Sequence, residues 1–161
     1  MSAMMVVFLV IILSVLVMAV GFAGLFLWVR RLRREAAGAL RDELAEDVLH
    51  VADCNFMGML SSGYAQVRGN GLLALTRDGL RFRMLLPRRS FYIPLSSIKG
   101  VTYPRRFLGK FKGGELLRVD FANSAGKEDA CAWLVADPHW WGEAIAALLE
   151  GKDPPPPDRR S

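Results

Sequence analysis

Cysteine and histidine are scarce in this chain, with two of each among 161 residues. The two cysteines, Cys54 and Cys131, form neither a disulfide framework nor a metal motif at their spacing. The sequence also contains no Walker loop, no dinucleotide-binding glycine pattern and no nucleophile elbow. We therefore predict a protein that is not an enzyme and that has no catalytic residue, metal site or cofactor. Both cysteines are predicted to be small buried residues with free thiols.

One arrangement of reactive side chains stays open as an alternative. If the segment around His50 is helical, His50, Asp53 and Cys54 share one face at i, i+3 and i+4, where an imidazole could activate a thiol. The segment offers no obvious oxyanion donors. His139 falls in the first turn of the last predicted helix, and we expect it to pack or cap rather than react.

Charged side chains are missing altogether from residues 3–29. A helix of this length extends for about 40 Å, which exceeds the roughly 30 Å hydrocarbon core of a bilayer. Basic residues that flank a span stay on the cytoplasmic side. Here they all follow the apolar segment: Arg30, Arg31, Arg33 and Arg34. We therefore predict one transmembrane helix at 3–29, with the N-terminus outside and the remaining chain in the cytoplasm.

A secretory signal peptide is the competing interpretation of this segment. Its apolar stretch would be about half as long and would follow a basic segment, whereas Met1-Ser2-Ala3 has no basic side chain. We favour a retained anchor, which predicts a single-pass protein of the cell (inner or plasma) membrane. Organelle membranes stay open as an alternative.

Residues 30–51 predict a helix that continues beyond the membrane. The segment lacks proline, and Gly38 is its only weak helix former. Apolar side chains recur at spacings of four, four and three and form one stripe: Leu40, Leu44, Val48 and Val51. The stripe can pack on the following domain or on a second copy. We favour the domain, because the stripe covers too few heptads for a coiled coil.

From about Phe56 the apolar residues recur with a period of two, which indicates β-strands. Turns are predicted at Gly69-Asn70-Gly71 and at Asp78-Gly79. Between residues 80 and 84, apolar and basic residues alternate strictly, as in a half-buried antiparallel strand. The series amounts to about seven short strands, which predicts a small sandwich or barrel.

A helix and a proline-rich tail follow the strands. Asp137 is a good N-cap, Pro138 suits the first helical position, and Gly151 lies just past the end. Four apolar side chains share one face that needs a partner to cover it: Trp141, Ala144, Ile145 and Leu148. The domain should therefore extend over residues 52–151. Residues 152–161 contain four consecutive prolines and are predicted to be disordered.

Two segments of this domain resemble the GRAM and bacterial PH-like families. Residues 69–82 (GNGLLALTRDGLRF) contain the run G-x-L-x-L-T-x-x-x-L-x-F, and residues 93–101 (IPLSSIKGV) match I-P-L-x-x-I-x-x-V. The resemblance implies that residues 52–151 form a mainly β PH-like (GRAM-type) domain. Its expected architecture is about seven antiparallel strands in a sandwich or barrel plus a C-terminal α-helix. The resemblance also implies an anchor in a bacterial cytoplasmic membrane.

The phosphoinositide site of some PH domains is not carried over to this chain. Those relatives have a dense basic motif along the first hairpin, with its cations separated by a long loop. Here the first hairpin turn is predicted at residues 69–71, with about three residues, and Arg68 is its sole basic flank.

The residues from Tyr103 to Gly114 form a glycine-punctuated loop with four cations and three aromatic rings. Aromatic rings can seat at the head-group boundary of a bilayer while cations meet phosphates. The arginines of the 87–89 turn could extend such a surface. The candidate contacts to lipid or to a partner are Arg88, Arg89, Arg105, Arg106, Phe107, Lys110, Phe111 and Lys112. The alternative is a solvated loop with Phe107 or Phe111 tucked into the core.

The sequence thus favours a non-catalytic interaction module, a scaffold or adaptor that binds a protein partner or another copy of itself. The alternative is a module that binds anionic phospholipid through its basic loops. Nucleic acid would meet a similar pattern of cations and aromatics, but the membrane tether and the short basic cluster argue against it.

Overall fold

The computed structural model describes residues 3–43 and 48–157, and the chain forms two compact units, residues 1–42 and 43–161. The first unit is the helix α1 (Ala3–Glu43), in which every residue from Met4 to Trp28 is exposed. Its stretch Met4–Leu32 contains an 18-residue window with a mean hydropathy of 3.1. The helix is therefore long and apolar enough to cross a membrane, as an anchor or as a signal sequence.

The predicted continuation of this helix to residue 51 is wrong at its end. α1 ends at Glu43, and Val48 opens strand β1 (Val48–Met59). Val48 pairs with Thr76 and Val51 with Ala74, so hydrogen bonding to the next strand decides their conformation rather than their helical spacing. The predicted apolar stripe is therefore lost, and its member Leu44 lies outside the described residues.

The second unit consists of nine strands and one α-helix in its described part. After β1 come β2 (Gly69–Thr76), β3 (Gly79–Met84), β4 (Arg89–Pro94), β5 (Ile98–Thr102), β6 (Arg106–Phe107), β7 (Lys110–Phe111), β8 (Leu117–Ala122), β9 (Glu128–Leu134) and α2 (Pro138–Leu149). Seven strands form one antiparallel sheet in the order β4-β3-β2-β1-β9-β8-β5, while β6 and β7 form a separate hairpin. The predicted fold class is confirmed: an N-terminal helix, seven antiparallel strands and a C-terminal helix.

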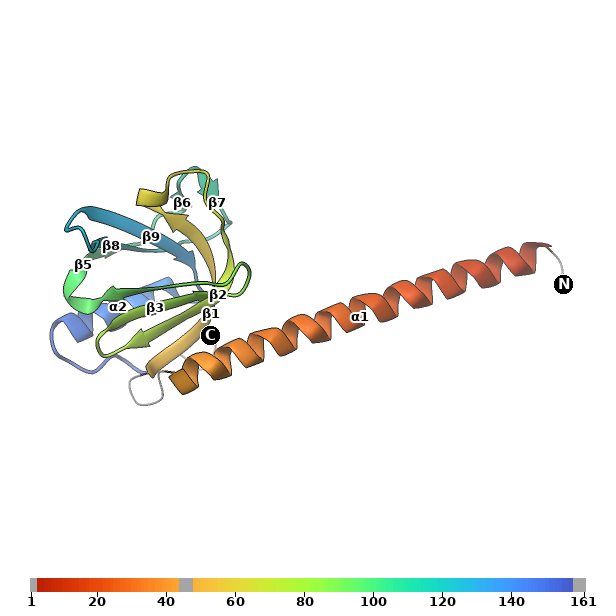
Figure 1. Ribbon diagram of the computed structural model, residues 1–161, viewed down its shortest axis with the longest axis horizontal. Helices are drawn as coiled ribbons and strands as arrows, with labels where there is room; N and C mark the ends of the chain where they lie inside the picture. Colours follow the sequence, from red (N-terminus) through yellow and green to blue (C-terminus); the bar gives the residue numbers. More distant parts are fainter. Residues whose placement is uncertain (1–2, 44–47, 158–161) are drawn as a thin grey trace. The chain divides into compact units, whose positions relative to one another are not determined.

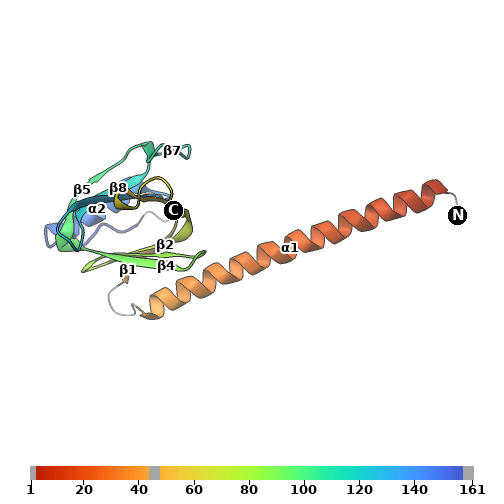
Figure 2. The same cartoon turned by 45° about the horizontal axis from the view of Figure 1, so that its top comes forward.

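The long sheet folds over into two layers. Strands β1 to β4 form one layer, and β5, β8 and β9 form the other (Figure 1). Figure 2 shows the two layers facing each other, with β2 and β4 below and β5 and β8 above. Strand β1 joins the layers, because it pairs with β2 over most of its length and with β9 from Asn55 onward.

The turn predicted at Gly69-Asn70-Gly71 is wrong, because these residues begin β2. The true connection between β1 and β2 is residues 60–68, which include the 3-10 turn Leu60–Ser62. Gly71 has a packing role instead: an added Cβ would lie 2.5 Å from the ring of Phe82. The turn predicted at Asp78-Gly79 does connect β2 to β3.

The space between the layers is filled by a cluster of buried side chains that includes Phe56, Phe82 and Trp133. A second, smaller cluster is built from Met57, Phe107, Leu116, Ala130 and Ala132. All buried members of both clusters lie between residues 54 and 148. Residues 43–161 therefore carry their own hydrophobic core, and we expect them to fold without α1.

Helix α2 forms as predicted. The Asp137 carboxylate accepts a hydrogen bond from the amide of Trp140 at 3.0 Å, and Pro138 occupies the first helical position. The four side chains of the predicted apolar face are buried. Beyond the helix, the indole of Trp140 donates to the carbonyl oxygen of Pro155 at 3.1 Å. The disorder of residues 152–161 stays a prediction.

Candidate functional site

Three connections between strands lie together, and we call them the rim loops: residues 60–68 (β1 to β2), 85–88 (β3 to β4) and 103–116 (β5 to β8). The amide of Leu85 donates to the carbonyl oxygen of Asn70 at 3.0 Å, which ties the second loop to the start of β2, directly after the first loop. Gly109 lies beside Tyr64, because a Cβ added to Gly109 would be 3.9 Å from the tyrosine ring. The third loop therefore also reaches the first.

The rim loops and the adjoining end of β4 hold six exposed cations, all of them predicted site residues: Arg88, Arg89, Arg105, Arg106, Lys110 and Lys112. None of the six forms an ion pair within residues 3–43 and 48–157. Other arginines of the domain do pair, such as Arg118 with Asp120 at 2.6 Å and Arg81 with Asp78 at 3.4 Å. The rim loops therefore present positive charge that no neighbouring carboxylate neutralises.

Exposed apolar side chains gather on the same loops. Among the described residues after α1, seven large hydrophobic side chains are exposed, and five of them are in the rim loops: Leu60, Tyr64, Val67, Leu86 and Phe111. Tyr64 is 74% exposed and Phe111 is 59% exposed. Apolar side chains that cluster on a charged surface mark a contact site for a membrane or a protein.

Of the two phenylalanines proposed as contacts, the structure leaves only Phe111 at the surface. Phe107 is 5% exposed and belongs to the smaller core cluster. It follows the exposed Arg106 in β6, and successive side chains of a strand point to opposite sides. Phe107 is therefore removed from the candidate contacts. Its burial agrees with the alternative prediction that Phe107 or Phe111 packs into the core.

Four exposed apolar residues of the rim loops were not among the predicted contacts: Leu60, Tyr64, Val67 and Leu86. The first three lie in the β1–β2 connection, which the turn signal at residues 69–71 had misplaced. Ser61-Ser62-Gly63 is the turn-rich signal that could have located this loop. The corrected loop still lacks a dense basic motif, because Arg68 is its one cation and its Nε donates to the carbonyl oxygen of Met57 at 2.6 Å.

Polar contacts at partly buried positions hold the first rim loop in place. The carboxylate of Asp129, 4% exposed, accepts hydrogen bonds from the amide of Ser61 at 2.9 Å and from its hydroxyl at 2.5 Å. The side-chain amide of Gln66 exchanges two hydrogen bonds with the backbone of Met59, at 2.6 and 2.8 Å. These contacts reduce the freedom of the loop and so position its exposed side chains.

Asp129→Ala is expected to lower the free energy of unfolding by about 2 kcal/mol, because it removes the charged acceptor of two hydrogen bonds from Ser61 and leaves the buried amide of Ala130 without that partner. Urea unfolding of residues 43–161 measures the change. Glu128→Ala is the matched control, since Glu128 is the exposed neighbour on the same strand. Equal stability of the two variants would contradict the anchoring role of Asp129.

A cavity of about 500 Å³ opens next to the first two rim loops. Core side chains of β1, β3 and β4 line it, among them Phe56, Phe82 and Phe91, and the exposed Arg88 and Arg89 lie at its mouth. Two other cavities in the described part of the domain measure about 250 Å³ each.

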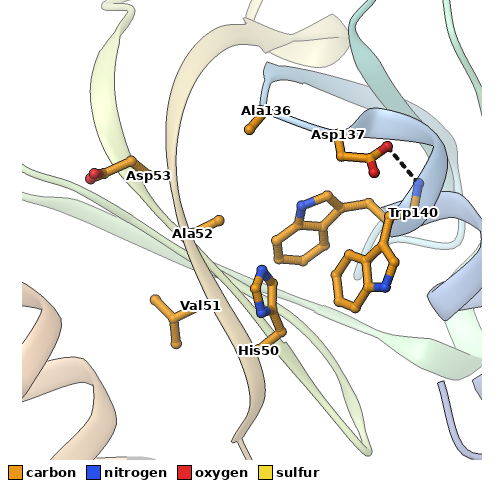
Figure 3. A pocket seen from close by; sticks show the side chains of 8 residues that line it. His50, Val51, Ala52, Asp53, Ala136, Asp137 and Trp140 are labelled. Carbon is orange, nitrogen blue, oxygen red and sulfur yellow. Dashed lines mark hydrogen bonds between the residues drawn. The ribbon is translucent and has the colours of Figure 1, made fainter. Parts of the chain in front are cut away.

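One of the smaller cavities lies between β1 and α2 (Figure 3). The ring of His50 is 4.5 Å from that of Trp140 and 5.4 Å from that of Trp141, measured between centroids. Figure 3 shows Asp53 pointing away from the tryptophans, as expected three residues along a strand. The helical arrangement of His50, Asp53 and Cys54 is therefore wrong.

The same strand geometry separates His50 from the thiol of Cys54, since four residues of a strand extend for about 13 Å. Both cysteines are buried with free thiols, as predicted. Burial raises the pKa of the Cys54 thiol above its usual range, and it also raises the pKa of Cys131. A buried, protonated thiol is a poor nucleophile. No group of three or more His, Cys, Asp or Glu side chains in the described ranges is arranged to hold a metal ion.

His139 packs, as predicted. Its ring lies 4.1 Å from that of Tyr103, and its Nε2 is 2.7 Å from a carboxylate oxygen of Glu115. Burial also raises the pKa of the Tyr103 hydroxyl, and the carboxylates of Glu143 and Asp137 add to the effect. These contacts connect α2 to the ends of the third rim loop.

Comparison with models of known protein families gives no match, and no curated protein matches the sequence. Among solved structures, the C-terminal domain of an unknown protein from Leishmania infantum is similar, with a TM-score of 0.51 and 16% identity over 71% of this chain and 97% of that one. A chain of the 8S snRNP assembly intermediate follows at a TM-score of 0.47 and 12% identity, covering 72% of this chain and 90% of that one. At such identities the likeness to the first concerns the fold alone, and the second carries no argument.

Proposed function

We propose that this protein is a membrane-anchored, non-catalytic interaction module whose rim loops bind the surface of an anionic bilayer. In this proposal α1 is retained as a single-pass anchor of the cell membrane. The arginines that follow its apolar stretch keep the domain on the cytoplasmic side.

The strand order supports a PH-like, GRAM-type domain. Four consecutive antiparallel strands form one layer, three more form the second, and a C-terminal helix is packed against the sheet. Both segments that carry the family resemblance lie in the antiparallel sheet. Residues 69–82 form the β2–β3 hairpin, and residues 93–101 connect β4 to β5.

The choice of anionic lipid depends on one observation. Six exposed cations, none of them ion-paired within the described residues, coincide with five exposed apolar side chains on the rim loops and the adjoining end of β4. Cations near an anionic leaflet contribute about 1 kcal/mol each. Aromatic rings such as those of Tyr64 and Phe111 favour the head-group boundary. A partner protein would also accept such a surface, but it would not account for the excess of one charge so directly.

Residues 43–161 are expected to co-sediment with vesicles of phosphatidylcholine and phosphatidylglycerol and much less with phosphatidylcholine alone. Binding should weaken as salt rises, because the screening length falls from about 10 Å at 0.1 M to about 3 Å at 1 M. Arg105→Gln with Arg106→Gln should reduce the affinity by about 30-fold, which corresponds to about 2 kcal/mol.

Arg77→Gln is the control for this double variant, because Arg77 is an exposed arginine in the β2–β3 turn, away from the rim loops, and it pairs with Asp153. It should leave vesicle binding nearly unchanged. If the wild-type domain ignores anionic vesicles, or binds neutral and anionic vesicles equally, the lipid proposal fails. A protein partner or a second copy of the chain then becomes the leading candidate for the rim loops.

A further inference from the structure

The cavity beside the first two rim loops has the size of a small-molecule site. Its volume of about 500 Å³ lies within the range of roughly 300 to 1,000 Å³ that such sites occupy. The two other cavities, at about 250 Å³, lie below this range. The larger cavity reaches the core cluster beside Phe56, Phe82 and Phe91.

The floor of this cavity is made of packed apolar side chains. The ring of Phe82 is 4.9 Å from that of Phe56 and 5.0 Å from that of Phe91. Phe82 and Met84 are 1% exposed, so the floor is fixed by the surrounding core. Methionine adapts its shape to irregular apolar groups. Met59 and Phe91, which are only partly buried, present the apolar surface above this floor, and burying apolar surface favours a hydrocarbon chain.

The mouth of the cavity, in contrast to its apolar floor, is positively charged. Arg88 and Arg89 are exposed there, and no acidic residue lines the cavity. Neither guanidinium is paired with a carboxylate in the described part of the chain. A guanidinium binds a carboxylate through two parallel hydrogen bonds, which favours an anionic group at this position.

We propose that the cavity binds one long-chain fatty acid, with the hydrocarbon chain against Met59 and Phe91 and the carboxylate at Arg88 and Arg89. The charge at the mouth and the apolar floor together select a molecule that is anionic at one end only. This site goes beyond the contact of the rim loops with a bilayer surface, because the fatty acid is held as a single molecule inside the domain.

Equilibrium dialysis of residues 43–161 against laurate, kept below its critical micelle concentration, tests the site. Laurate should bind with one molecule per domain. Dodecanol, which has the chain without the charge, should bind at least tenfold more weakly, because it lacks the charge-assisted hydrogen bonds. Butyrate, which has the charge with little chain, should not bind at the same concentration. Butyrate binding as tight as that of laurate would overturn the proposal.

Variants separate the cavity from the general positive charge. Ser90→Trp places an indole among the lining residues without removing a core side chain, and it should abolish laurate binding. Ser62→Trp, in the first rim loop, is a second blocking variant should Ser90→Trp fail to fold. Arg88→Gln with Arg89→Gln should weaken laurate binding at least tenfold, whereas Arg77→Gln should not. Unchanged binding in a folded blocking variant, or no binding by the wild type, would overturn the proposal.

The two proposals can fail separately. Vesicle binding that persists in Ser90→Trp, with no laurate binding by the wild type, would leave the bilayer contact and remove the fatty-acid site. Laurate binding without any vesicle binding would do the reverse.

Discussion

Gly79→Ala is expected to lower the free energy of unfolding of the domain by about 3 kcal/mol. An added Cβ would lie 2.1 Å from the carbonyl oxygen of Ile93 and 3.0 Å from the amide nitrogen of Leu95. Both obstacles are backbone atoms, so the clash can be relieved only by moving β4 away from β3. Forcing extra volume into a packed site costs about 1 to 3 kcal/mol, and the upper end applies where the neighbours cannot yield.

Thermal unfolding of residues 43–161 measures this effect, which corresponds to a fall in Tm of about 12 °C at about 4 °C per kcal/mol. Gly100→Ala is the matched control, because a Cβ on Gly100 would meet nothing within 4 Å. Its stability should change by less than about 0.5 kcal/mol. If Gly79→Ala were as stable as Gly100→Ala, the close approach of β3 to β4 at this glycine would be contradicted.

Trp133→Ala is expected to have the largest effect, a loss of about 3 to 5 kcal/mol. The indole is fully buried, and its ring lies about equally far from those of Phe56, Phe82 and Phe91, at 6.0 to 6.1 Å between centroids. Trp133 also pairs with Phe56 of β1, where the two layers of the sheet join. Its Nε1 has no hydrogen-bond partner among the described residues, so the loss comes from packing alone.

Urea unfolding should show this loss as a lower midpoint, and a domain whose stability is about 5 kcal/mol would be close to unfolding in water. Phe111→Ala is the control for removing an aromatic ring, because Phe111 is largely exposed. It should leave the free energy of unfolding within about 0.5 kcal/mol of the wild type. A comparable loss of stability in both variants would contradict the assignment of Phe111 to the surface.

The elements that could be predicted from the sequence are those in which local signals agree with packing. The charge-free stretch and the arginines after it predict the apolar helix. Asp137 and Pro138 predict the start of α2. The alternation in residues 80–84 predicts β3, where Leu80 and Phe82 are buried while Arg81 and Arg83 are only partly covered.

Local signals failed where a distant neighbour decides the conformation. Gly71 has the composition of a turn, yet it lies in β2, where it pairs with Cys54 and Met84, and the ring of Phe82 occupies the space where a side chain would be. Residues 48–51 have the spacing of a helix, but pairing with β2 makes them a strand. Neither the contact of Gly71 with Phe82 nor the pairing of residues 48–51 with β2 can be deduced from the local sequence alone.

Only part of the candidate site could be predicted, because local sequence signals determine some of its residues and the fold determines the others. Unpaired cations can be expected from a local excess of Lys and Arg, and the structure leaves all six of them exposed. The inward direction of Phe107 depends on the two-residue strand β6, which has no clear pattern of its own. The fatty-acid cavity could not be predicted, because Phe56, Phe82 and Phe91 come from three strands that meet only in the fold.

The place of β1 in the sheet decides how the domain would respond to mechanical load. The chain enters the domain through β1, so tension applied along α1 acts first on Val48. Residues 48–54 are hydrogen-bonded to β2 on one side only, so their hydrogen bonds to β2 would break one after another. From Asn55 the strand is held by β2 and β9 together, and both ladders must break at once. The domain would thus yield by a short, reversible extension before its main resistance at Asn55 and Phe56.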